Sequence, residues 1–276
     1  MGYATRFAPS PTGLLHRGHA FSALSAYQRA KELGGRFVLR IEDIDQTRCR
    51  PAFTDALLDD LAWLGLTWEQ PVRIQSQHMA DYHAALGQLR DLGLVYRCFK
   101  TRKEMADDIG RAPHGLGPAY RGAPVLAAEE SARLEAGEPY AWRLSLDAAK
   151  AHLGDYYDSL SFTDELRGTH SARPHLAGDV VLARKDLGVA YHLAVVVDDG
   201  LQAMTHIVRA EDLLEATGIQ CLLQALLGLP TPIYRHHRLL LGPDGKRLAK
   251  RDLSQTLQDL RRQGLSAEQL RAQLGF

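Results

Sequence analysis

The chain has 276 residues, of which 45% are hydrophobic, and its 33 Lys and Arg residues balance 33 Asp and Glu residues. This composition excludes a disordered or fibrous chain and fits one large domain or two modest ones. There is no signal-peptide core, no run of 18 apolar residues and no disulfide framework among Cys49, Cys98 and Cys221, so we expect a globular protein of the cytoplasm without membrane association.

The N-terminal part of the chain predicts a strand, helix and second strand in succession. Residues 3–8 read as a short strand, and the prolines and glycine of 9–13 form the loop that follows. Residues 16–33 have apolar side chains at helical spacing and end at a Gly-Gly pair. Residues 37–41 (FVLRI) form the next strand. This order and length are typical of a parallel-sheet nucleotide-binding fold.

The remaining elements follow in chain order. Amphipathic helices are predicted first, and a segment rich in Gly and Pro at 96–139 indicates a loop-rich insertion. Residues 235–276 carry nine Lys or Arg against four Asp or Glu, an excess that is compatible with a phosphate-rich partner and is also common on a solvated helix face. The predicted helices are 53–64, 79–92, 211–227 and one from about 266; the predicted strands are 140–146, 179–183, 190–197 and 207–209, with a hairpin-like turn at 198–200.

The strongest chemical signal lies at residues 5–19, where TRFAPSPTG is followed by His16, Arg17, Gly18 and His19. The free N–H groups at a helix start favour phosphate oxygens. His16 and His19 are about one turn apart, so both can donate hydrogen bonds to one polyphosphate, and Gly18 leaves room for a nucleotide ring. The alternative is that these are unrelated surface residues.

Three segments resemble landmarks of one enzyme family. HRGH at 16–19 resembles the HIGH signature of class I aminoacyl-tRNA synthetases, and RFAPSPTG and FVLRIEDID (37–45) resemble its glutamyl and glutaminyl branch. GKRLAKR (245–251) resembles the KMSKS loop. The resemblance implies an α/β fold with a Rossmann-type catalytic domain (1–98 and 176–230), an inserted acceptor-type α+β subdomain (99–175), and a C-terminal segment (231–276) that holds the KMSKS-like loop and a short helical part.

The resemblance also implies which residues bind glutamate. A substrate with two carboxylates and one ammonium needs cationic donors and one anion, and the planar Arg fork distinguishes a carboxylate from an amide by charge. Two alternatives stay open: Arg6, Glu42 and Arg209 form structural ion pairs, or Glu42, Asp43 and Asp45 hold Mg²⁺. The implied glutamate-binding residues are Arg6, Ala8, Ser10, Glu42, Tyr191 and Arg209.

For ATP, the resemblance implies binding by His16, Gly18, His19, Arg247 and Lys250, with His16, His19 and Lys250 in catalytic roles. The developing charge on the phosphates requires such donors and cations. The KMSKS-like loop departs from its pattern, because Arg247 replaces the first Lys and Ala249 the Ser. A basic turn without function is the alternative.

The cofactor expected from the resemblance is ATP with Mg²⁺, and no protein-bound metal. Relatives often carry a zinc site in the insertion, with a Cys-x-Cys pair followed by Tyr-x-x-x-Cys. Here Lys100 and Pro124 occupy two of those ligand positions, and neither binds zinc. We therefore predict no zinc.

Only 25 residues follow Arg251, too few for the helical anticodon-binding part of a complete glutamyl-tRNA synthetase. The chain resembles the short paralogues of that family, the glutamyl-Q tRNA(Asp) synthetases. That resemblance implies a ligase, expected to be a monomer, that takes L-glutamate, ATP and tRNA(Asp) carrying queuosine. The alternatives are a non-catalytic tRNA-binding paralogue, glutamylation of another tRNA, and a related enzyme that acts on a small molecule.

Overall fold

The computed structural model describes residues 2–101, 104, 120–184, 188–240 and 255–276. The strands are β1 Ala4–Phe7, β2 Arg36–Ile41, β3 Arg73–Ile74, β4 Val95–Cys98, β5 Ala141–Leu144, β6 Ser161–Asp164, β7 Gly168–Ser171, β8 Val181–Arg184, β9 Gly188–Val189, β10 His206–Ala210 and β11 Ile233–His237. The helices are α1 Arg17–Glu32, α2 Pro51–Trp63, α3 Met79–Asp91, α5 Ala127–Glu135, α6 Leu146–Leu153, α7 Asp155–Ser159, α8 Tyr191–Leu201, α9 Ala216–Leu226, α10 Leu257–Arg262 and α11 Ala267–Leu274, with 3-10 turns at Gln75–Gln77, Pro174–Leu176 and Glu211–Leu213.

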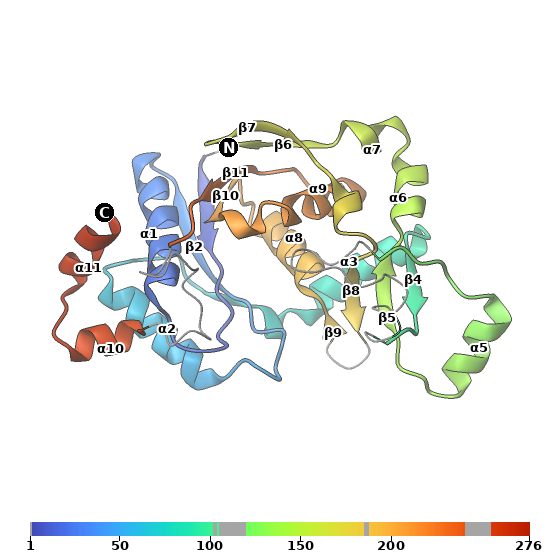
Figure 1. Ribbon diagram of the computed structural model, residues 1–276, viewed down its shortest axis with the longest axis horizontal. Helices are drawn as coiled ribbons and strands as arrows, with labels where there is room; N and C mark the ends of the chain where they lie inside the picture. Colours follow the sequence, from blue (N-terminus) through green and yellow to red (C-terminus); the bar gives the residue numbers. More distant parts are fainter. Residues whose placement is uncertain (1, 102–103, 105–119, 185–187, 241–254) are drawn as a thin grey trace.

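Parallel strands form the centre of the molecule. β1, β2 and β3 pair in parallel, and so do β10, β11 and β6. The N–H of Thr205 donates to the carbonyl of Ala4 at 3.0 Å, so β10 lies beside β1 and the two sheets run edge to edge. Helix α1 packs against this junction (Figure 1). The predicted strand–helix–strand unit at the N-terminus is confirmed, and with it the Rossmann-type fold.

Helix α1 joins β1 to β2 because its buried face is built from small side chains. Ala20, Ala23, Ala26 and Ala30 are all buried, which lets the helix lie close to the sheet. After the helix, Gly35 passes so near β1 that a Cβ there would lie 2.4 Å from a backbone oxygen. The Gly-Gly pair therefore allows a tight return into β2 as well as ending the helix.

A second sheet lies to one side and contains β4, β5, β8 and β9, paired antiparallel (Figure 1). The hairpin of β6 and β7 instead extends the parallel sheet through β11. β4, which precedes residue 99, and β8 and β9, which follow residue 175, share a sheet with β5. The hairpin of β6 and β7, within 161–171, joins the sheet that contains β10. The domain limits expected at 98/99 and 175/176 stay a prediction, because sheet membership alone does not define domains.

The predicted strand at 190–197 is wrong, because this segment begins helix α8. Leu193 through Val197 are all buried, and α8 packs against α3, α9 and β8. A helix covered on all sides is apolar on all sides, so it lacks the helical period that marks a half-exposed helix. The predicted turn at 198–200 is wrong for the same reason: Asp198 and Asp199 are buried in the last turns of α8.

The C-terminal helices α10 and α11 pack beside α1 and α2 through Leu257, Leu260 and Leu270 (Figure 1). Thr256 pairs with His16, and the N–H of Leu257 donates to the carbonyl of Leu15 at 2.9 Å. Residues 256 and 257, at the start of α10, are thereby fixed to the start of α1. In the described part of the chain, no helix has the length and apolar character needed to span a bilayer.

Candidate active site

A cavity of about 620 Å³ lies where β1 and β2 end and α8 begins. Among the residues predicted to bind substrate, Ser10, His19, Glu42 and Tyr191 line it. In an open parallel sheet, ligands bind beyond the carboxyl ends of the strands, at the point where the strand order reverses. That point here is the junction of β1 and β10. The fold therefore brings these four side chains, from segments up to 181 residues apart, to the place where a ligand is expected.

The side chains of the two histidines form a capping box at the start of helix α1. Nδ1 of His16 accepts from the N–H of Gly18 at 3.1 Å, and Nδ1 of His19 accepts from the N–H of His16 at 3.2 Å. An imidazole that accepts through Nδ1 carries its proton on Nε2, so both rings hold Nε2–H as a donor. A Cβ at Gly18 would lie 3.0 Å from the ring of His16, so the missing side chain accommodates that ring.

Two predicted glutamate contacts are held by buried ion pairs whose partners, Arg40 and Asp199, the sequence analysis did not name. Arg6 binds both oxygens of Asp199, at 3.0 and 3.3 Å. Arg40 is fully buried and lies between Glu42, at 2.9 Å, and Asp199, at 2.8 Å. These pairs join β1, β2 and α8. The alternative of structural ion pairs therefore holds for Arg6 and Glu42, and of the two Glu42 lines the cavity.

A third carboxylate extends this network. Asp198 accepts from Arg73 at 2.7 Å, from Gln75 at 2.8 Å and from the hydroxyl of Tyr82 at 2.9 Å. The network contains three guanidinium groups, including that of the partly exposed Arg73, and four carboxylates, because Asp81 also accepts from Arg73 at 2.6 Å. Pairing of this kind offsets the cost of burying the charges. One local sign of the network is visible in the sequence, namely the two adjacent acids Asp198 and Asp199 after an apolar run.

The buried carboxylates respond differently to their surroundings. Burial raises the pKa of Glu42, although Arg40 and Arg6 oppose the shift. Burial also acts to raise the pKa of Asp199, but Arg6 and Arg40 together hold this pKa below its ordinary value. Asp199 is therefore a satisfied anion, whereas Glu42 lines the cavity and would gain from a further cation.

Arg209 has a different set of partners. Its guanidinium donates to His236 at 3.0 Å, to Gln220 at 2.8 Å and to Thr217 at 2.7 Å, and it is buried. Within the described residues, no carboxylate lies within 4.0 Å of it. The structural ion-pair alternative therefore does not apply to Arg209. A buried cation held only by neutral groups favours an anionic ligand.

Tyr191 connects these charges. Burial raises the pKa of its phenol, and Arg209, Glu42 and Arg6 all lie close enough to influence this pKa. Glu42 and Tyr191 line the cavity, whereas Arg6 and Arg209, whose charges act on the same phenol, are not among its lining residues. Ala8 is half-buried directly after β1 and does not line the cavity, whereas Arg247 and Lys250 lie outside the described residues.

The part of the insertion where relatives carry zinc ligands is held by hydrogen bonds. Asp179 accepts from the hydroxyl of Tyr96 and from the N–H of Gly122, both at 2.9 Å, and Sγ of Cys98 lies 3.8 Å from the hydroxyl of Tyr120. Zinc takes four thiolate, imidazole or carboxylate ligands, and such a set does not converge here among the described residues. The prediction that zinc is absent stays a prediction.

Comparisons with known proteins agree with this geometry. The chain is 44% identical to a glutamyl-Q tRNA(Asp) synthetase of Rhodobacter capsulatus, over 99% of both chains. It is also 44% identical to one of Nocardia farcinica, over 99% of this chain and 84% of that relative. A crystal structure of a glutamate tRNA ligase from Elizabethkingia meningosepticum, in complex with its amino acid, superimposes with a TM-score of 0.76 at 29% identity. The match covers 91% of this chain and 52% of that structure, so the chain spans about half of its length.

The family model described as tRNA synthetases class I (E and Q), catalytic domain, matches residues 3–275. This match, together with the relatives, confirms the expected synthetase-type ligase. The chain belongs to the catalytic-domain family of the class I glutamyl- and glutaminyl-tRNA synthetases.

Proposed function

We propose that this protein activates L-glutamate with ATP and transfers the glutamyl group to queuosine at the wobble position of tRNA(Asp). The observation that carries the first step is Arg209, a buried cation without a carboxylate partner among the described residues. Its charge acts on the phenol of Tyr191, which lines the same cavity as Glu42. An amino acid with a side-chain carboxylate supplies the missing anion, and its ammonium suits Glu42.

The same charges explain the choice of amino acid. Glutamine has the shape of glutamate but no negative charge, so it leaves Arg209 without a counter-ion. A buried charged group that loses its partner costs several kcal/mol, which makes charge a strong basis for discrimination. Arg6, which lies in β1, and Ser10, which lies in the loop after β1, complete the expected contacts with glutamate.

Activation requires in-line attack of the glutamate carboxylate on the α-phosphorus of ATP, which releases pyrophosphate. The Nε2–H donors of His16 and His19 suit phosphate oxygens that gain negative charge. Lys250 and Arg247 are the proposed cations for the leaving pyrophosphate, and Mg²⁺ arrives with the ATP phosphates. Thr256, six residues after Lys250 in sequence, pairs with His16, and this supports the proposed role of Lys250.

In the second step, a hydroxyl of the cyclopentene ring of queuosine attacks the glutamyl carbonyl of the adenylate, which forms an ester and releases AMP. The names of the most similar relatives carry this part of the proposal. The inserted segment 99–175 is the proposed acceptor-type subdomain, between the catalytic parts 1–98 and 176–230. We also propose that the protein acts as a cytoplasmic monomer.

Glutamate-dependent exchange between ATP and labelled pyrophosphate, without tRNA, tests the activation step. Exchange with glutamate, and at least 100-fold less with glutamine or aspartate, is expected. Absence of exchange, with tRNA binding retained, would support the non-catalytic binding paralogue instead.

Transfer of labelled glutamate to tRNA pools tests the acceptor. The pools come from cells that make queuosine and from cells that lack it. Label should appear on tRNA(Asp) in the first pool only. Equal labelling of both pools, or labelling of tRNA(Glu), would contradict the proposed acceptor and leave the activation step standing.

A further inference from the structure

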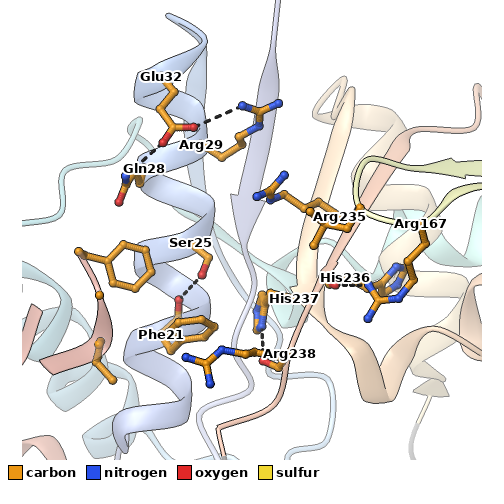
Figure 2. Close-up of a pocket in the computed structure, with 14 residues that line it drawn as sticks. Phe21, Ser25, Gln28, Arg29, Glu32, Arg167, Arg235, His236, His237 and Arg238 are labelled. Atoms are coloured by element: carbon orange, nitrogen blue, oxygen red, sulfur yellow. Dashed lines mark hydrogen bonds and ion pairs between the residues drawn. The ribbon is translucent and has the colours of Figure 1, made fainter.

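A second cavity, of about 720 Å³, lies outside the candidate active site. It opens between α1, β11 and the C-terminal residues, where one face of the parallel sheet extends beyond α1 (Figure 2). We call it the β11 groove and define it by the lining residues that matter below, namely Phe21, Arg29, Arg235, His237, Arg238 and Phe276. None of these residues takes part in the proposed glutamate or ATP site.

The β11 groove is positively charged. Its lining contains four arginines, Arg29, Arg167, Arg235 and Arg238, and one acidic side chain, Glu32. Arg29 pairs with Glu32 at 3.3 Å and also shares Glu165 with Arg235, at 3.1 and 3.0 Å. Arg238 is exposed, and within the described residues it has no carboxylate partner. Its guanidinium lies 5.6 Å from the ring centroid of Phe21. Arginine groups that are left with unused donors are suited to phosphate.

The same groove contains aromatic rings. Phe21 meets His237 edge-on, with centroids 5.1 Å apart, and Phe276 at 5.5 Å. Phe21 and Phe276 are each half-buried, so part of each ring faces outward. A row of arginines beside half-exposed aromatic rings is the combination with which proteins hold unpaired nucleotides, because the rings stack with bases while the arginines bind the backbone.

His237 adds a third feature. Its Nδ1 lies 2.9 Å from the carbonyl of Arg238, so Nδ1 carries the proton and donates. Nε2 is then an acceptor, and it is buried with no hydrogen-bond partner among the described residues. Burial lowers the pKa of His237, which keeps the ring neutral. An acceptor of this kind needs a hydroxyl or amino donor, which a ribose 2′-hydroxyl or a base provides and a bare phosphate does not.

We propose that the β11 groove binds a short unpaired stretch of RNA, with its phosphates on Arg235 and Arg238 and a base against Phe21. This inference rests on the proposed function, in which the RNA is the acceptor tRNA. It adds a contact surface separate from the cavity where the glutamyl group is transferred. Bound RNA would thus be held at two places on the enzyme.

The test compares two variants of the full chain. In the first, Arg235→Gln and Arg238→Gln are combined; Glu165 then keeps Arg29, and no buried carboxylate loses its only partner. The control is Arg90→Gln, which removes an exposed arginine of α3 that pairs with its neighbour Asp91. The dissociation constant for queuosine-bearing tRNA(Asp) is measured as a function of salt, and pyrophosphate exchange without tRNA is measured in parallel.

The double variant should bind tRNA about tenfold more weakly than the control, and the slope of log Kd against log salt should fall by about 1.4 for two lost phosphate contacts. Exchange should match the wild type, which also shows that the variant is folded. Phe21→Leu should weaken tRNA binding without changing the salt slope, because it removes stacking and no charge.

An unchanged tRNA dissociation constant in the double variant would overturn the β11 groove proposal while leaving the function intact. Failure of the wild type to catalyse exchange would instead overturn the proposed function, so the two failures are distinguishable. In a further comparison, an unpaired RNA strand and a DNA strand of the same sequence are bound to the enzyme. Equal dissociation constants for the two would exclude a contact between a ribose hydroxyl and His237.

Discussion

At the scale of single residues, two arginines that the sequence predicts for the same task turn out to have different surroundings. Arg6 is neutralised by Asp199, at 3.0 Å, whereas Arg209 is held by His236, Gln220 and Thr217. An arginine already paired with a carboxylate has less to offer a substrate than one held by neutral groups. Arg209 should therefore dominate the recognition of the glutamate carboxylate, with Arg6 shaping the site beside it.

Replacing this arginine by Arg209→Gln should remove the charge while keeping hydrogen-bonding capacity. The KM for glutamate in pyrophosphate exchange should rise about 100-fold, which corresponds to about 2.7 kcal/mol, within the range of a hydrogen bond to a charged group. The KM for ATP should stay within twofold. Arg262→Gln, whose side chain is 74% exposed on α10, serves as the control. A glutamate KM that does not change would show that the anion binds elsewhere.

At the scale of elements, helix α9 illustrates a contact that only a glycine permits. Gly218 lies in the first turns of α9, where a Cβ would lie 2.8 Å from the backbone nitrogen of Arg173. The helix therefore runs against the backbone at the 3-10 turn Pro174–Leu176. Arg209 donates to Thr217 and Gln220 on either side of this glycine, so the close contact also positions the cation.

Gly218→Ala should consequently destabilise the protein by about 1–3 kcal/mol, because either the helix or the turn must move. Gly87→Ala on α3 is the matched control, since nothing lies within 4 Å of a Cβ there. That change should stabilise by about 0.5–1 kcal/mol, through the helix propensity of alanine. Urea denaturation of both variants measures the difference. Equal stability of the two would contradict the close approach.

The packing of α10 on α2 includes a buried carboxylate. Asp60 is fully buried, neither of its oxygens has a hydrogen-bond partner among the described residues, and Arg261 lies 3.7 Å away. Burial raises the pKa of Asp60 to about 6, although Arg261 opposes the shift. Between the unfolded value near 3.8 and this folded value, the folded state binds more protons. Stability therefore falls as the pH rises through that interval.

Asp60→Asn removes this penalty and should stabilise the protein by about 2–3 kcal/mol at pH 8, with little effect at pH 4. In a chain of this size, the melting temperature at pH 8 should rise by about 4–8 °C. The exposed neighbour Asp59 provides the control Asp59→Asn, which makes the same change of charge. If Asp60→Asn stabilised the protein equally at both pH values, Asp60 would be ionised in the folded state at pH 4 as well as at pH 8.

At the scale of the whole molecule, the sequence could predict whatever depends on local pattern. The first strand, α1 with its histidines, and the second strand lie within 41 residues and have clear periods and breakers, so the fold of this part followed, while the phosphate contacts of the histidines stay a prediction. The buried network did not follow, because Arg6 and Asp199 are separated by 193 residues and no local pattern links them. Helix α8 was missed because tertiary burial on every side removes its period.

This long-range assembly leads to a prediction for the molecule as a whole. The expected glutamate contacts come from β1, the end of β2, α8 and β10, so a ligand bound to all of them joins both halves of the parallel sheet. A non-hydrolysable glutamyl-adenylate analogue, at 100 times its Kd, should stabilise the folded state by about 2.7 kcal/mol and raise Tm by about 5–10 °C. The aspartyl counterpart is one methylene shorter, so its carboxylate falls short of Arg209 and it should give a much smaller shift at equal concentration. If the Arg209→Gln variant showed the full rise in Tm with the glutamyl analogue, the ligand would not join the two halves through β10.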